Sequence, residues 1–144
     1  MGKNEKALIP TEPESFVTHR LFTDGAARGN PGPAGAGAVL FDGDRQVKTL
    51  SHYLGDKLTN NESEYRALII GLEMALSQGA SKLEVLMDSQ LIVNQLLGKY
   101  KIKQPHLRVL ANETRKLTCR FESINFTHIE RKLNKQADKL ANLA

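Results

Sequence analysis

Four carboxylates lie far apart in this chain, and each stands in a distinctive local sequence. They are Asp24 in Phe-Thr-Asp-Gly-Ala, Glu64 in Asn-Asn-Glu-Ser-Glu-Tyr, Asp88 in Met-Asp-Ser and Asp138 in Gln-Ala-Asp-Lys-Leu. Acids without histidine or cysteine partners suit hard divalent cations, because Mg²⁺ and Mn²⁺ take oxygen ligands and keep positions open for water and phosphate. If the four converge in the fold, they predict a metal-dependent site for phosphoryl transfer.

Each acid also has an ordinary structural explanation. Asp24 stands in an Asp-Gly turn pair, and Glu64 follows Asn61 at the spacing of a capping box. Asp88 precedes a predicted helix, whose positive end favours an acid. Asp138 fits a solvated helix face, with a surface pair to an asparagine four residues away. Their shared placement at strand ends and helix starts, where ligand sites assemble, still favours one site.

The hydrophobic pattern predicts an α/β domain. Strands are expected at residues 16–23, 35–41, 45–54, 83–87 and 121–129, and helices at 61–78, 89–97, 106–117 and 134–143. The first strand is expected to stop at the Asp-Gly pair of residues 24 and 25. The first three strands can form an antiparallel meander, and the later two, separated by helices, should be parallel.

Length and composition limit the possible classes. The chain has 144 residues and a single cysteine, which predicts one domain without an internal disulfide. Residues 1–15 are polar with two prolines, so we expect a flexible tail before a domain at 16–144. No apolar run approaches the roughly 20 residues of a membrane helix. Without an apolar signal core, a cytoplasmic location is expected.

The net charge of +4 is unevenly distributed along the chain. Residues 1–96 hold 9 Lys and Arg against 12 Asp and Glu, a net of −3, whereas residues 97–144 hold 11 against 4, a net of +7. An acidic metal site beside a basic surface suits a polyanion that is both held and cut. A solubilising surface charge is the alternative explanation.

Four motifs in series resemble those of the ribonuclease HI (type 1 ribonuclease H) family. The first is Thr-Asp-Gly-Ala-Ala-Arg-Gly-Asn-Pro-Gly-Pro-Ala-Gly at 23–35, followed by Thr-Asn-Asn-Glu-Ser-Glu at 59–64, Asp-Ser-Gln at 88–90 and Asn-x-x-Ala-Asp-x-Leu-Ala at 134–141. The resemblance covers about residues 16–144. It implies an RNase H-like fold, a five-stranded mixed sheet of three antiparallel and two parallel strands with helices on both faces. It also implies hydrolysis of the RNA strand of RNA–DNA hybrids, leaving 5′-phosphate and 3′-hydroxyl ends.

The same resemblance assigns roles to individual residues. Asp24, Glu64, Asp88 and Asp138 would bind two Mg²⁺ ions, for which Mn²⁺ would substitute. Contacts with the hybrid would come from eight further residues: Gly25, Ala26, Asn30, Thr59, Asn60, Asn61, Gln90 and Asn134. Hydrogen bonds to the 2′-hydroxyl distinguish RNA from DNA. The expected protein is a monomer.

The chain departs from many family members in two places. Many carry a mobile histidine in a glycine-rich loop before the last acid, but here that segment is short and lacks glycine. We favour Arg131 over His128 as the assisting residue, because His128 falls inside a predicted strand. The chain also has no tryptophan, and only Lys-Tyr-Lys-Ile-Lys at 99–103 stands in place of the basic handle that grips the hybrid. We therefore expect weaker, more salt-sensitive binding.

Three alternative functions compete with this one. A catalytically weak binding module on the same fold is disfavoured because all four acids are present. A nuclease or integrase acting on DNA is disfavoured by the motifs around Asn61 and Gln90. Activity extending to double-stranded RNA stays open.

Overall fold

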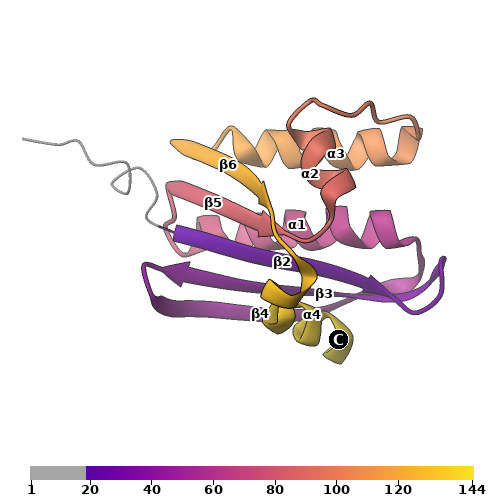
Figure 1. The fold of residues 1–144 in the computed structure, drawn as a ribbon, viewed down its shortest axis with the longest axis horizontal. Coiled ribbons are helices and arrows are strands. Elements are labelled where there is room, and N and C mark those ends of the chain that lie inside the picture. The colour runs from indigo at the N-terminus through magenta and orange to yellow at the C-terminus, as the bar shows by residue number, and fades with distance from the viewer. Residues whose placement is uncertain (1–18) are drawn as a thin grey trace, which may run out of the picture.

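The fold is a five-stranded mixed sheet with helices on both faces (Figure 1). This computed structural model describes residues 19–144, so the predicted tail and the first residues of the predicted first strand lie outside it. The elements in chain order are β2 (His19–Ala27), β3 (Gly32–Asp42), β4 (Arg45–Leu58), α1 (Asn60–Ser77), β5 (Lys82–Met87), α2 (Gln90–Leu96), α3 (Pro105–Thr118), β6 (Ser123–His128), the short 3₁₀ helix η2 (Arg131–Leu133) and α4 (Lys135–Leu143).

The strand order β4-β3-β2-β5-β6 confirms the predicted sheet. β2, β3 and β4 pair antiparallel, and β5 and β6 continue the sheet parallel to β2. β4 and β5 run in the same direction, so the chain must cross the sheet between them. The long α1 makes this crossover. β2 is therefore the central strand, with the parallel and antiparallel halves on its two sides.

The main core lies between the sheet and the layer formed by α1, α2 and α3. Leu21, Leu40, Leu68, Leu72 and Val85 are all 0% exposed and belong to one apolar cluster. Burying each such side chain contributes about 1.5–3 kcal/mol. This core holds α1 against β2, and both elements carry an acid of the candidate site.

The opposite face of the sheet is covered by α4, which lies unusually close to β3. A Cβ atom on Gly35 would lie 2.2 Å from the Ala141 carbonyl oxygen, and one on Gly37 would lie 2.0 Å from that of Ala137. The helix backbone therefore rests directly on these two glycines, a contact that any side chain there would prevent. Asp138 follows Ala137, so this contact also sets the position of its backbone.

The start of α1 differs from the prediction. The N-cap is Thr59, whose hydroxyl accepts from the Glu62 amide at 3.1 Å, while the Glu62 carboxylate accepts from the Thr59 amide at 2.8 Å. The predicted capping pair of Asn61 and Glu64 is wrong, because the capping box lies two residues earlier and pairs Thr59 with Glu62. Glu64 is consequently free for another role.

The strands also run differently from the prediction. β2 does not stop at Asp24 but continues to Ala27, because β3 pairs with every residue up to Ala27 opposite Ala34. β4 extends four residues past the predicted end, to Leu58. The predicted loop before α4 contains η2. Within residues 19–144, no helix has the length and apolar character that crossing a membrane requires.

Candidate active site

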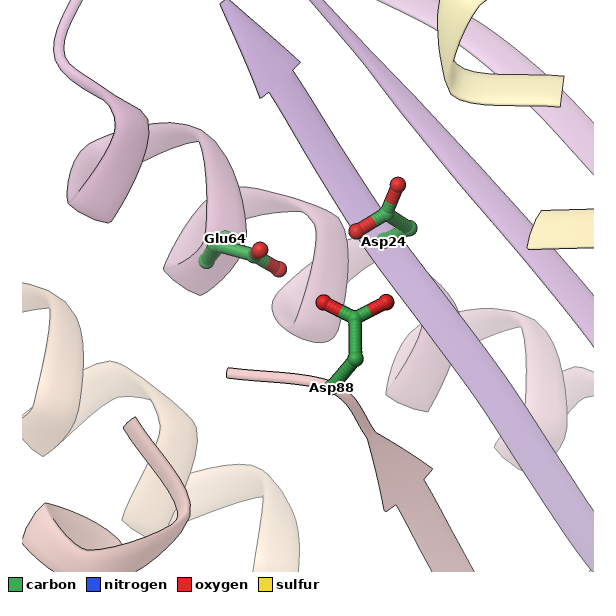
Figure 2. Close-up of side chains that lie close together, drawn as sticks. All are labelled: Asp24, Glu64 and Asp88. Atoms are coloured by element: carbon green, nitrogen blue, oxygen red, sulfur yellow. The ribbon is translucent and has the colours of Figure 1, made fainter. Parts of the chain in front are cut away.

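Three of the four predicted acids converge beside the central strand (Figure 2). Asp24 comes from β2, Glu64 from the second turn of α1, and Asp88 directly follows β5. One carboxylate oxygen from each lies within 4.8 Å of the others. Residues separated by up to 64 positions thus present an oxygen-only donor set, which is the type that hard divalent cations prefer.

A glycine allows α1 to bring Glu64 to the strand. The Gly25 amide donates to Glu64 Oε1 at 3.2 Å, and a Cβ atom on Gly25 would lie 2.2 Å from the Ser63 carbonyl oxygen. Any other residue at position 25 would push the helix away from β2. The motif glycine after Asp24 therefore has a steric reason, although it does not form the turn that the sequence predicted.

Asp88 is oriented by a buried asparagine. The Asn134 amide nitrogen donates to Asp88 Oδ2 and to the Thr23 carbonyl oxygen, both at 2.9 Å. Asn134 is 1% exposed, so its burial favours a role in positioning Asp88. Its predicted contact with substrate stays a prediction.

The converging carboxylates strongly perturb one another. Burial and then the charge of Glu64 raise the pKa of Asp24 to about 9. Burial and then the charge of Asp88 raise the pKa of Glu64 to about 8, against opposing effects of the Gly25 amide and the Arg131 charge. Like charges this close favour protonation unless a cation compensates them. The donor set and its electrostatics therefore fit a divalent cation.

Asp138 completes the site from the α4 side. It lines a cavity of about 490 Å³ together with the other three acids and Arg131, and a hydrogen bond with Asp138 is among the causes that raise the pKa of Asp24. Arg131 Nη2 lies 3.8 Å from Asp138 Oδ1, and the arginine side chain is 83% exposed. His128 ends β6 and is not among the residues that line this cavity. Of the two competing residues, the structure thus brings Arg131 to the acids.

Comparison with protein families matches residues 22–144 to the family described as reverse transcriptase-like. The chain belongs to this ribonuclease H-like family. It is 42% identical over 133 residues to ribonuclease HI of Halobacterium salinarum, covering 92% of this chain and 67% of that protein. It is 45% identical over 123 residues to bifunctional protein Rv2228c of Mycobacterium tuberculosis, covering 85% of this chain and 34% of that protein. The chain therefore spans about a third of the length of this mycobacterial relative.

Solved ribonuclease H structures share the fold. The N-terminal RNase H domain of Rv2228c from Mycobacterium tuberculosis superposes with a TM-score of 0.84 at 42% identity, covering 89% of this chain and 98% of that one. LC11-RNase H1, solved in complex with an RNA/DNA hybrid, gives a TM-score of 0.82 at 41% identity, covering 88% of this chain and 95% of that one.

The remaining predicted contacts of this ribonuclease H-like chain lie around the rim. Gly25, Ala26 and Asn60 line the acidic cavity. Asn30 is exposed, and its side-chain oxygen accepts from the backbone amide of Asn60 at 3.0 Å. Thr59 uses its hydroxyl to cap α1. The structure therefore gives Asn30 and Thr59 local structural contacts beside the site, and their binding of substrate stays a prediction.

Two further predicted contacts come from the helices α1 and α2. Asn61 lines a second cavity of about 480 Å³ together with Tyr100, Leu107 and three lysines, Lys99, Lys101 and Lys103. Gln90 is exposed at the first position of α2. Because Asn60 lines the acidic cavity and Asn61 lines the cavity with the lysines, the start of α1 lies between the two.

The sequence predicted no role at the site for Asn142, which lines the acidic cavity, or for Arg28, which contacts Asn142. Asn142 donates its amide hydrogens to Asp138, and Arg28 donates to the Asn142 carbonyl oxygen. The i,i+4 spacing between Asp138 and Asn142 was the available signal, and it indicated only a surface pair. Nothing in the local sequence links Arg28 to a segment 114 residues away.

Proposed function

We propose that this chain is a ribonuclease H that hydrolyses the RNA strand of RNA–DNA hybrids and leaves 5′-phosphate and 3′-hydroxyl ends. The observation that carries the proposal is the convergence of Asp24, Glu64 and Asp88 within 4.8 Å, in a cavity that Asp138 completes. The identity of 42% to a ribonuclease HI supports the reaction. The similarity to a ribonuclease H1 solved with an RNA/DNA hybrid supports the substrate.

Asp24, Glu64, Asp88 and Asp138 would hold divalent cations, with Mg²⁺ as the natural ion and Mn²⁺ as a substitute. When bound, a pair of such ions supplies Lewis-acid stabilisation of the phosphate oxygens and a more acidic water. The acids themselves contribute their close packing, because four neighbouring carboxylates in a partly buried site bind a cation to relieve their own repulsion. Asn134 contributes by fixing the orientation of Asp88.

Arg131 acts as a cation at the mouth of the cavity. Its guanidinium cannot serve as a general base at neutral pH, but it binds phosphate oxygens with two parallel hydrogen bonds. Because the side chain is 83% exposed and pairs loosely with Asp138 at 3.8 Å, it can leave that acid for a phosphate. Its role is to draw the substrate phosphate in and to assist departure of the product.

Recognition of the hybrid rests on groups that address sugar and phosphate. The amides of Asn61 and Gln90 provide partners for 2′-hydroxyls, and the backbone at Gly25 and Ala26 borders the cavity that receives the RNA strand. Such contacts carry little base information, so sequence preference should be weak.

The protein acts as a cytoplasmic monomer.

The direct test is cleavage of end-labelled nucleic acids by the wild type and Asp24→Asn. The substrates are an RNA–DNA hybrid, double-stranded RNA and double-stranded DNA of one sequence, each with Mg²⁺ or Mn²⁺ and with chelator. We expect metal-dependent cleavage of the RNA strand in the hybrid, and a loss of at least about 100-fold in Asp24→Asn because one ligand to the cations is removed.

Absence of metal-dependent hybrid cleavage by the wild type would refute the enzyme. Equal cleavage by Asp24→Asn would refute the site. Comparable rates on double-stranded RNA would widen the substrate class without changing the reaction.

A further inference from the structure

Asp138 is held differently from the other three acids. It comes from the first turn of α4, and it lines the cavity without belonging to the tight group formed by Asp24, Glu64 and Asp88. Two groups approach the same oxygen of its carboxylate. Arg131 Nη2 lies 3.8 Å from Oδ1, and the Asn142 amide nitrogen donates to Oδ1 at 3.3 Å.

Asn142 is itself fixed against the helix. Its amide nitrogen also donates to the Asp138 carbonyl oxygen at 2.9 Å, which folds the side chain back over one helical turn. Residues four apart on a helix are neighbours, so this contact needs no distortion of α4. With one amide hydrogen committed to the backbone, the other is held against the carboxylate.

Arg28 fixes Asn142 from the sheet. Its guanidinium donates to the backbone carbonyl oxygen of Asn142 at 2.6 Å. A cation at the C-terminal end of a helix is favourable, because the last carbonyls carry partial negative charge and lack partners within the helix. Arg28 directly follows β2, the strand that carries Asp24. The contact therefore ties the last turn of α4 to the central strand of the site.

The two neighbours of Asp138 differ in charge. The guanidinium of Arg131 attracts the carboxylate and competes with a metal ion for it. A neutral amide orients the carboxylate by a hydrogen bond and leaves its full negative charge available to a cation. The contact from Asn142 thus suits a ligand that must stay ionised and directed into the cavity.

We propose that Asn142, held by Arg28, is a positioning residue that presents Asp138 to the divalent cations. The inference rests on the proposed function, in which Asp138 is one of their ligands. Loss of an outer partner of a metal ligand typically lowers metal affinity about 10–100-fold. A change in metal affinity therefore separates positioning from a role in helix stability alone.

The test compares Asn142→Leu, which keeps a side chain branched at Cγ but removes the amide, with Gln136→Leu as the matched control. Gln136 is an exposed amide on the same helix, and it contacts Gln46 and not Asp138. Mn²⁺ binding to each protein without nucleic acid is measured by calorimetry. Hybrid cleavage is measured as a function of Mg²⁺ concentration.

We expect Asn142→Leu to weaken Mn²⁺ binding and to raise the half-maximal Mg²⁺ concentration about tenfold, with the rate at saturating Mg²⁺ within about twofold of the wild type. Gln136→Leu should change neither quantity. Asn142→Gln, which keeps an amide donor at the i,i+4 position, should restore part of the affinity. Arg28→Ala should act in the same direction, and the double variant should lose less than the product of the single losses.

Equal metal affinities in Asn142→Leu and Gln136→Leu would overturn the inference. So would a lower melting temperature of Asn142→Leu with unchanged Mn²⁺ affinity, because Asn142 would then only stabilise the helix. If the wild type binds Mn²⁺ but cleaves no hybrid, the proposed function fails, and the calorimetry still decides the role of Asn142.

Discussion

At the residue scale, the site is an arrangement of acids that is unfavourable without a cation. Asp24 is 5% exposed, and its pKa is raised to about 9 by burial and then by the neighbouring acids, Glu64 first. The unfolded chain ionises the same group near 3.8. Between these two values the folded protein binds more protons than the unfolded one, so this group makes stability fall as pH rises.

Asp24→Asn should therefore stabilise the metal-free protein at neutral and alkaline pH. The gain over the wild type should be about 1–3 kcal/mol at pH 8 and should shrink as the pH falls toward 3.8, below which the wild-type carboxyl becomes protonated in the unfolded state as well as in the folded one. Urea denaturation across this pH range measures it. Saturating Mg²⁺ should reduce the gap, because a bound cation stabilises only the folded wild type. A gap that does not depend on pH would contradict the assigned cause.

A second prediction at the residue scale concerns which side chain assists cleavage, Arg131 or His128. Arg131 pairs with Asp138 in the acidic cavity, whereas His128 lies at the end of β6 outside its lining. Arg131→Ala should lower the cleavage rate about tenfold, within the range for losing a charged hydrogen bond to phosphate. His128→Ala should change it by less than about twofold. Single-turnover rates measure both, and a larger loss for His128→Ala would reverse the assignment.

At the element scale, the close contact of α4 with β3 positions the fourth acid. A Cβ atom at position 37 would lie 2.0 Å from a backbone oxygen, and backbone cannot move aside as a flexible side chain can. The helix must shift as a whole if this glycine is replaced. The same shift would carry Asp138 away from Asp24.

Gly37→Ala should destabilise the protein by about 3 kcal/mol or more, because overpacking here displaces a whole helix. Gly43→Ala is the control, since nothing lies within 4 Å of its Cβ position and only its positive φ of 62° adds strain. That strain costs about 1 kcal/mol. Denaturant midpoints of the two variants measure the difference, and equal midpoints would show that α4 tolerates displacement.

The sequence predicted the elements better than their boundaries. Hydrophobic periodicity and turn residues gave the order of five strands and four helices, and the motif resemblance gave the acids. Local patterns failed where a distant partner decides the outcome. β2 continues past Asp24 because β3 pairs with it. Thr59 caps α1 in place of Asn61, because its hydroxyl accepts from the Glu62 backbone amide. The contacts made by Gly37 and Arg28 involve segments 100 or more residues away, which no local pattern records.

At the scale of the whole molecule, charge separates into an acidic centre and a basic flank. The flank includes Lys99, Lys101 and Lys103, which with Tyr100 line the cavity beside Asn61. Three cations and an aromatic ring suit a nucleic-acid backbone and a sugar or base face. The chain thus has a small basic surface at residues 99–103, where the sequence predicted a reduced handle.

Hybrid binding should depend steeply on salt and less steeply without these lysines. Replacing all three by alanine should make the slope of log K against log salt shallower by about two to three, since each phosphate contact releases about one counterion. Lys48→Ala on β4 is the control and should change the slope by less than about one. Fluorescence anisotropy with a labelled hybrid in Ca²⁺ measures K, and equal slopes for triple variant and wild type would place the hybrid elsewhere.

The hydrogen bond from Arg28 to Asn142 spans 114 residues of the chain, and the acids it supports come from β2 and α4. Contacts of such long range form late, because a long loop must close first. A partly folded chain in which α4 has not docked therefore lacks Asp138 at the cluster of ligands. Catalytic activity should then appear in refolding only with the last cooperative step, which makes hybrid cleavage a reporter of complete folding.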